Sequence, residues 1–593
     1  MSDDTAVSTT QYDVIIIGGG TAGCVIAGRL TEAFPEVSIL VIEAGTDSTD
    51  DEVVARPLQG MFSALMGAKT AVNFISEVDK HLNGRALPIA AGNTLGGGSA
   101  VNFMIYNQAP ASDWDDWKQP GWSAKEMQPF IHKSVSYKAE HGDPNKHGKD
   151  GRMVVTNGGY TSPKWMEDFF RVVPLTRNTK QLVDMADQEH SDGFGWHAKW
   201  IDDKGVRSTS YNSYITKRQL LKPPSNLTIL SNTKVHHIII DHGKAVGVKL
   251  VDGTEIKADQ QVILSAGGFG SPLIMERSGL GGKEVLGAAG VEVKVDLPGV
   301  GKEYRDKQLV LSGYHIDETC ETLDSFLSMD MSTITAQLLQ YMVDGTGQFA
   351  TNGLNMGLKW RPTEEEIAEL GPDFAAHWKS VAEDKPDKPV ATSAFSCQFM
   401  GDRSTLPPGK YMAFGWWSNY QASVGSLHIS SSDPEAPPHF QSGLLDQSAD
   451  MPVLVFMYKW TREIARRIAV YRGEYAAGHP AFHPDSAAAC KRHDGPITDD
   501  AKIVYTKEDN IIIEDWIRSN VVSAWHSMST CPMADRAEGG VVDAKLDVYG
   551  VTGLKIADVS VVPKHMGTNM ASVALAIGER CASIVEDELK AQD

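Results

Sequence analysis

The sequence has few cysteines, no long apolar run and no excess of basic residues. Its six cysteines, among 593 residues, lie far apart and form no C-x-x-C pair. That spacing argues against a zinc site and against a disulfide framework, so we expect no metal. No apolar stretch reaches the roughly 18 residues of a membrane-spanning helix. The net charge of −21 disfavours nucleic acid and anionic membrane surfaces as partners.

We recognise no targeting signal at either end of the sequence. Residues 1–11 are polar and slightly acidic, unlike a secretory signal. The final residues, DELKAQD, match no retention or peroxisomal tripeptide. We therefore expect a cytoplasmic or otherwise unspecified intracellular location. A hydrophobic content of 42% is ample for a large buried core.

The most informative motif follows the apolar run at residues 12–17, which predicts one buried strand. The motif is G-x-G-x-x-G, with glycines at 18, 20 and 23. A second apolar run at 37–42 ends at Glu43. Gly18 permits a tight turn, Gly20 lets the backbone approach a pyrophosphate, and Gly23 allows close packing of helix and strand. The helix N-terminus and the Glu43 carboxylate then suit phosphate and ribose, which predicts dinucleotide binding.

Further strands are expected later in the chain. Residues 226–235 and 245–251 alternate in hydrophobicity, and the run QVILSA at 261–266 is followed by two glycines. Residues 330–490 are rich in Trp, Met, Phe and Pro, which suits a separate substrate domain with an antiparallel sheet. A helix is expected from residue 509 toward His526. A strand and helix over 553–587 are expected to rejoin the first domain.

Four segments in order resemble the glucose-methanol-choline (GMC) flavin oxidoreductases. They are the dinucleotide motif with Glu43, GNTLGGGSAVN at 92–102, SAGGFGSP at 265–272, and a carboxyl block that starts at Trp525-His526. Segments of the substrate domain resemble the fungal alcohol (methanol) oxidase branch. These are ATNG at 350–353, RPT at 361–363, EDKPDKPV at 383–390 and PPGKYM at 407–412.

The resemblance implies an α/β fold in which a Rossmann-like FAD-binding domain joins an α+β substrate domain with an antiparallel sheet. Both domains are discontinuous in sequence. We expect the FAD-binding domain to comprise residues 1–155, 225–315 and 525–593. The substrate-binding domain is expected to comprise residues 156–224 and 316–524.

The cofactor implied is FAD, held without a covalent bond, because Val101 occupies the place where some members carry a flavin-tethering histidine. Glu43 would hold the adenosine ribose, the Val235 backbone would meet the adenine, and the loop from Gly96 would line the isoalloxazine. The residues that the resemblance assigns to FAD are Gly18, Gly20, Thr21, Ala22, Gly23, Glu43, Ala44, Gly96, Gly98, Ser99, Asn102, Phe103, Val235, Ala266, Asp558, Asn569, Met570 and Ala571.

Two histidines are the expected catalysts. Oxidation of an alcohol by flavin requires loss of a hydroxyl proton and of a hydride, and an imidazole suits the first task. The resemblance implies His526 as the general base and His565 as the partner of the substrate oxygen. The alcohol oxidase branch typically has asparagine at the second position, so His565 is a departure. Phe103 and Trp525 are expected to wall the substrate pocket.

The expected reaction is oxidation of a primary alcohol to an aldehyde, with O₂ reduced to hydrogen peroxide. A dehydrogenase of the same fold that uses a quinone-type acceptor, a flavin-retaining lyase and an NAD enzyme are the alternatives. The expected partners are a small alcohol and O₂ or another electron acceptor, with no nucleic acid and no membrane. The expected assembly is a monomer or a small homo-oligomer.

Overall fold

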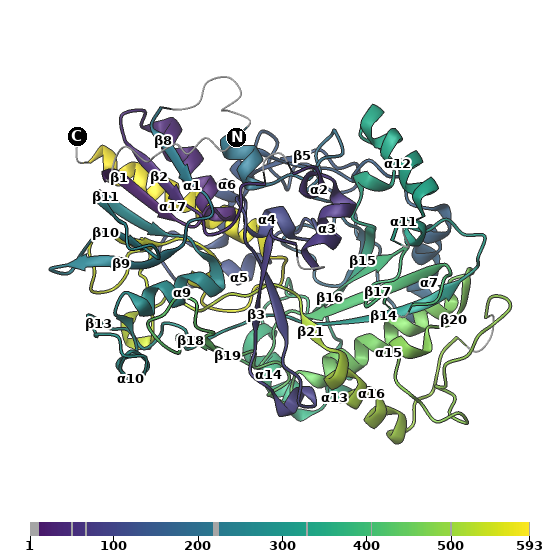
Figure 1. Ribbon diagram of the computed structural model, residues 1–593. Helices are drawn as coiled ribbons and strands as arrows, with labels where there is room; N and C mark the ends of the chain where they lie inside the picture. The colour runs from purple at the N-terminus through teal and green to yellow at the C-terminus, as the bar shows by residue number, and fades with distance from the viewer. Residues whose placement is uncertain are drawn as a thin grey trace.

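The computed structural model describes residues 11–48, 51–65, 68–216, 225–327, 330–404, 406–497 and 501–591 (Figure 1). Its two largest sheets have seven strands each and lie side by side, with the first sheet on the left of Figure 1 and the second on the right. The polar residues discussed below lie where these two sheets meet.

The first sheet is mostly parallel. Its order is β8 (Leu227–Leu230), β2 (Ile39–Ile42), β1 (Gln11–Ile17), β11 (Glu255–Leu264), β10 (Lys244–Leu250) and β9 (Val235–Asp241). A further strand, β22 (Leu554–Ile556), pairs in parallel with β11, while β10 and β9 are antiparallel. The strand β2 is buried at every position. This explains its continuous apolar run, since central parallel strands are covered on both faces.

The last helix of the chain packs against the first. Helix α1 (Thr21–Ala33) follows β1, and α17 (Ala571–Lys590), yellow in Figure 1, lies beside it. A Cβ on Gly578 would lie 2.9 Å from the Val25 Cβ, so the glycine allows the close approach. Arg29 of α1 forms ion pairs with two carboxylates of α17, Glu579 and Glu586. The carboxyl end is thereby fixed to the first strand–helix unit.

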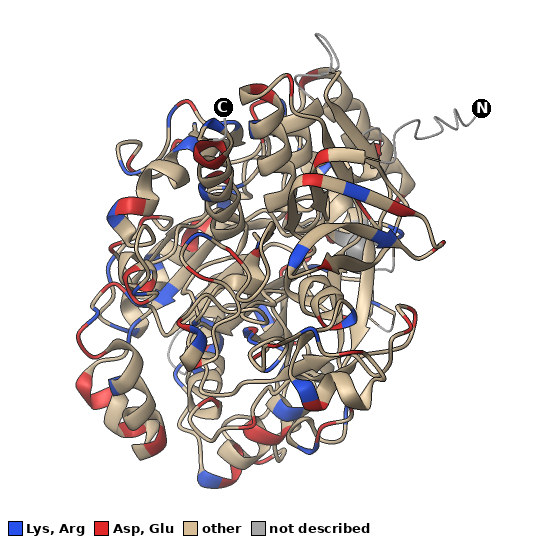
Figure 2. Ribbon diagram, turned by 90° about the vertical axis from the view of Figure 1, so that its left-hand side faces the viewer, with Lys and Arg blue, Asp and Glu red and all other residues tan. Residues whose placement is uncertain are grey.

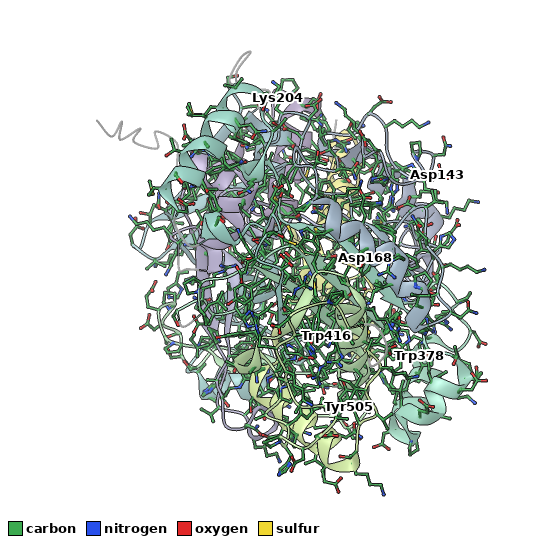
Figure 3. All side chains as sticks on the ribbon, turned by 90° about the vertical axis from the view of Figure 1, so that its right-hand side faces the viewer. Asp143, Asp168, Lys204, Trp378, Trp416 and Tyr505 are labelled. Carbon is green, nitrogen blue, oxygen red and sulfur yellow. The ribbon has the colours of Figure 1, made fainter. Side chains whose placement is uncertain are left out.

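The second sheet is antiparallel. Its order is β20 (Tyr471–Glu474), β14 (Gln308–Ile316), β17 (Tyr411–Ser418), β16 (Ala391–Ser396), β15 (Leu354–Trp360) and β7 (Gly193–Trp196), and β21 (Val522–Ser523) also pairs with β14. Helix α15 (Met451–Arg467) packs against β17. Strands β15, β16 and β17 are buried along their whole length. Trp416 of β17 accordingly lies inside the molecule in Figure 3, whereas Asp143 lies at its edge.

The expected fold class is confirmed: a Rossmann-like sheet with helices joins an antiparallel sheet domain, and both draw on separate parts of the chain. The strands and helices expected from the sequence appear as β1, β2, β8, β10, β11, β22, α16 (Lys507–Asn520) and α17. The exact domain bounds stay a prediction. The expected bound between the two domains, at residue 315, falls inside β14. This strand pairs with β17 of the second sheet from Leu309 onward.

Neither a membrane-crossing helix nor a cluster of metal-ligand side chains occurs in the part of the chain described. None of its helices combines the length and the hydropathy needed to cross a bilayer. Its His, Cys, Asp and Glu side chains form no group of three or more that could hold a metal ion. Lys and Arg segments alternate with Asp and Glu segments over the view in Figure 2.

Candidate functional site

The turn from β1 into α1 depends on glycine. Gly18 has φ +99°, and a Cβ there would lie 2.4 Å from the carbonyl oxygen of Ser265. A Cβ on Gly23 would lie 2.1 Å from the carbonyl oxygen of Gly18. The helix begins after Gly20 with no side-chain cap and no acidic residue in its first turn. Its first N–H groups therefore suit an anion such as a pyrophosphate.

A second glycine loop packs on this turn. The segment after β4 (Pro88–Gly92) contains Gly97, whose Cβ, if present, would lie 2.7 Å from the Cα of Gly20. The Thr21 hydroxyl donates to the Gly96 carbonyl at 3.1 Å and accepts from the Ser99 N–H at 3.2 Å. The loops expected to contact the two halves of a dinucleotide are thus joined directly.

Glu43 lies at the end of β2. Its carboxylate accepts the N–H groups of Gly19 and Gly45, each at 2.8 Å, and its backbone carbonyl accepts the Thr233 N–H at 2.9 Å. Burial raises the pKa of Glu43 to about 7. Each carboxylate oxygen retains a lone pair for a ribose hydroxyl. The Thr233 contact brings the start of β9, and with it Val235, toward this carboxylate, while Ala44 is exposed in the same loop.

Asp558 joins β22 to the N-terminus of α9 (Gly267–Arg277). Its carboxylate accepts the Gly267 N–H at 2.9 Å, the Ser271 hydroxyl at 2.6 Å and the Ser560 N–H at 2.7 Å. Ala266, at the N-cap of α9, lies in the same corner. Burial raises the pKa of Asp558. The second glycine signature and the carboxyl block are therefore held together by one carboxylate.

These segments fit FAD. The uncapped start of α1 suits the pyrophosphate, the Glu43 carboxylate suits a ribose, and glycines keep the intervening surface free of Cβ atoms. The assignment of individual residues to individual flavin atoms stays a prediction.

The side chain of His526 lies beside that of Asn569. The Nε2 of His526 and the side-chain amide nitrogen of Asn569 are 3.3 Å apart. The backbone N–H of His526 donates to Asp306 at 2.9 Å. The Nδ1 of His526 is buried and has no hydrogen-bond partner in the residues that the structure describes. An amide N–H of Asn569 can donate to Nε2, which gives that nitrogen the acceptor form that a general base requires.

His565 makes no side-chain hydrogen bond. It is 7% exposed, and neither of its ring nitrogens has a hydrogen-bond partner among the described residues. Its role at the substrate oxygen stays a prediction. The polar side chain beside His526 is Asn569, 43 positions further along the chain, which was expected to contact only the cofactor. A histidine is a more conspicuous candidate than an asparagine. No local sequence signal distinguishes Asn569 as the side chain that lies beside His526.

Both imidazoles are held neutral. Burial, followed by the charge of Lys307, lowers the pKa of His526 well below its ordinary value. Burial also lowers the pKa of His565 well below its ordinary value, assisted by the charges of Arg305, Lys307, His377 and Lys388. A neutral His526 can accept a proton at neutral and mildly acidic pH.

Phe103 and Trp525 form an apolar wall beside His526. Their ring centroids are 5.2 Å apart. Trp525 has φ +59°, and its backbone N–H donates to the Ser523 hydroxyl at 2.7 Å, which fixes the turn that carries the ring. Both rings pack on a small buried cluster separate from the main core, made of Ile105, Leu309, Leu354, Ala394, Trp417 and Ala524.

Arg207 supports the loop that carries Phe103. It is 1% exposed, and its guanidinium donates to the backbone carbonyl of Asn102 at 2.7 Å and to the Asn102 side-chain oxygen at 3.0 Å. The Asn102 side chain also accepts the Met104 N–H at 3.1 Å. Burial lowers the pKa of Arg207 to about 9. Its position therefore explains how a buried cation orders the end of the first signature.

An uncapped helix start flanked by glycine loops, a neutral imidazole and an apolar wall together suit a flavin-type oxidoreductase. The model of the GMC oxidoreductase N-terminal domain matches residues 12–308, and that of the C-terminal domain matches residues 421–578. The chain belongs to the GMC oxidoreductase family and is an FAD-dependent oxidoreductase.

The curated relatives agree with this assignment, and the solved structures share the fold. Alcohol oxidase from Candida boidinii is 37% identical, with 98% of this chain and 95% of that protein covered. Alcohol oxidase 1 from Komagataella phaffii is 34% identical over the same shares. A formate oxidase variant from Aspergillus oryzae has a TM-score of 0.82 at 21% identity, covering 98% of this chain and 99% of its own. A fungal aryl-alcohol oxidase has a TM-score of 0.77 at 21% identity, with the same coverage.

The contact between the two glycine loops predicts one sensitive position. In Gly97→Ala the added Cβ would lie 2.7 Å from the Gly20 backbone at a φ of +50°, so the loops must separate and the purified protein should contain much less flavin. Flavin absorbance per mole of protein measures this. Gly287→Ala, where a Cβ meets nothing within 4 Å, is the control and should retain wild-type flavin content. Equal flavin content in both variants would contradict the assigned cleft.

Proposed function

We propose that the protein oxidises a primary alcohol to an aldehyde with bound FAD and passes the electrons to O₂, forming hydrogen peroxide. The observation that carries the proposal is the 3.3 Å contact between the Nε2 of His526 and the Asn569 amide. The names of the alcohol oxidase relatives, at 34–37% identity over nearly the whole chain, support the substrate class and the acceptor.

The chain's own residues would act on the alcohol as a pair. His526 accepts the hydroxyl proton at Nε2, because its imidazole is held neutral. Asn569 donates an N–H to the same oxygen and orients the carbon that loses the hydride. Bound FAD supplies the hydride acceptor at N5. The alcohol thus loses one proton and one hydride, and O₂ takes up two electrons and two protons to give hydrogen peroxide.

The apolar wall favours an uncharged substrate. Phe103 and Trp525 contact each other and pack on a buried apolar cluster that includes Leu309 and Leu354 of the second sheet. A charged substituent would lose its hydration against this wall without gaining a partner.

A quinone-type electron acceptor in place of O₂ is the second candidate function. The proton transfer at His526 is the same with either acceptor, so the site does not distinguish them. Peroxide formed under air distinguishes them.

The flavin is proposed to be held without a covalent bond. Val101, in the first glycine signature, has an aliphatic side chain that cannot form a bond to the flavin. Acid precipitation of the purified protein should therefore leave the yellow flavin in the supernatant. The absorbance of pellet and supernatant measures the result, and flavin that stays with the pellet would contradict it.

His526→Ala should retain FAD but slow the anaerobic bleaching of the flavin by an alcohol roughly 10²–10⁴-fold, because the general base is lost. Stopped-flow absorbance with a panel of short, long and aromatic primary alcohols measures the rate. His483→Ala is the control, because its side chain is 72% exposed in the second domain. If wild type is bleached by no alcohol, or if His526→Ala is bleached as fast as wild type, the proposal fails.

Asn569→Ala and His565→Ala separate the two possible partners of His526. If Asn569 holds the substrate oxygen, its removal should lower kcat/KM about 10²-fold, on the scale of one lost transition-state donor. His565→Ala should then cost less than about tenfold, because no donor of His565 is aimed at His526. Steady-state kinetics with the best alcohol decide, and the reverse order of effects would restore His565 to the catalytic role.

A further inference from the structure

A buried ammonium group lies between the two loops that carry the catalytic side chains. Lys307 has no exposed surface, and its Nζ donates to the backbone carbonyl of Thr568, the residue before Asn569. Its own carbonyl accepts the N–H of Ala524, two residues before His526, at 2.9 Å. One residue therefore contacts both loops.

The neighbours of Lys307 complete the arrangement. Asp306 accepts the His526 N–H at 2.9 Å and the hydroxyls of Tyr304 and Ser523 at 2.8 and 2.5 Å. Asp113 accepts the Gly567 N–H at 2.6 Å. Consecutive peptide groups at Gly567 and Thr568 are thus held by a carboxylate and an ammonium, so the loop before Asn569 is fixed from both sides.

We propose that Lys307 is a positioning residue for alcohol oxidation, which fixes Asn569 relative to His526 and supplies the buried charge that keeps His526 in its base form. This inference rests on the proposed function. Its first part follows from the contacts with Thr568 and Ala524. Its second part follows from the burial of the ammonium, since a charge acts over a longer range where water is excluded.

The charges around both imidazoles agree with this role. Lys307 is the charged side chain that shifts the pKa of His526, and Asp306 contacts His526 through the backbone N–H. Around His565 the charged and titratable groups are Arg305, Lys307, His377 and Lys388. Burial lowers the pKa of Lys307 to about 7, and Asp113 and Asp306 oppose the shift. The ammonium is therefore charged below about pH 7, which is the range in which His526 would otherwise take up a proton.

The sign of the pH effect follows. Removing a neighbouring cation raises the pKa of an imidazole, because its protonated form is no longer repelled. The base form is then lost at a higher pH on acidification. Without Lys307, the acid limb of the pH profile of kcat/KM should move to higher pH.

Two variants separate position from charge. Lys307→Met removes both the charge and the donor to Thr568, and should also lower kcat, on the scale of about 10²-fold for a misplaced catalytic group. Lys307→Gln keeps a donor but removes the charge. It should keep kcat within about tenfold of wild type, and it should share the shifted acid limb.

A matched control exists in the second domain. Lys199 is also buried, donates from Nζ to the Asn157 carbonyl at 2.9 Å, and has its pKa lowered to about 7 by burial. It is not among the causes of the pKa shift of His526, which are burial and Lys307. Lys199→Met should therefore reproduce any general loss of stability but leave the acid limb in place.

The experiment measures FAD content, anaerobic flavin bleaching from pH 5 to 9, and the flavin absorbance change on binding trifluoroethanol, a poor hydride donor, over the same pH range. The inference is supported if the acid limb of the pH profile moves to higher pH in both Lys307 variants and stays in place in Lys199→Met. It is overturned if the acid limb stays in place in flavin-loaded Lys307 variants, or if it moves by the same amount in Lys199→Met. If Lys307→Met does not load flavin, Lys307→Gln decides alone. A wild type that no alcohol bleaches refutes the proposed function instead.

Discussion

The site depends on one buried carboxylate, that of Asp306. It accepts the backbone N–H of His526 and the hydroxyl of Ser523 in β21. Asp306 itself lies two residues before β14 begins. Strand β14 belongs to the antiparallel sheet, whereas the residue after His526 packs on α9, the helix that follows β11 of the first sheet. Burial raises the pKa of Asp306, and hydrogen bonds from the surrounding donors offset the cost of burying its charge. Without these bonds the two sheets would not fix the imidazole between them.

Local physics made much of the fold readable from the sequence. The turn at Gly18 and the close approach at Gly23 are demands of backbone geometry, so the residues that meet them are visible in one short segment. The buried strands β1 and β2 are equally visible as continuous apolar runs. The domain bound expected at residue 315 falls inside β14, although the strand lies wholly in the second sheet, because its apolar residues do not show which sheet it joins.

The pairing of catalytic residues could not be read in the same way. His565 and Asn569 are four positions apart, and nothing local distinguishes which of them faces His526. The choice is made by Asp113 and Lys307, which hold the peptide groups of Gly567 and Thr568 from positions more than 250 residues away. Arg207 likewise orders Asn102 through contacts between distant parts of the chain. Side chains that act through another residue's backbone leave no motif of their own.

The final helix has a consequence for how the protein is made. Asn569 lies just before α17, and α17 packs on α1, while β22 pairs with β11 in the sheet begun by β1. A ribosome that has delivered nine-tenths of the chain has therefore produced most of the dinucleotide fold but neither β22 nor the amide beside the imidazole. Domains otherwise form as synthesis proceeds. Here β22 and Asn569 join the first sheet and the imidazole only after residues 554–590 have been made, so a chain that stops before β22 lacks one side of this site.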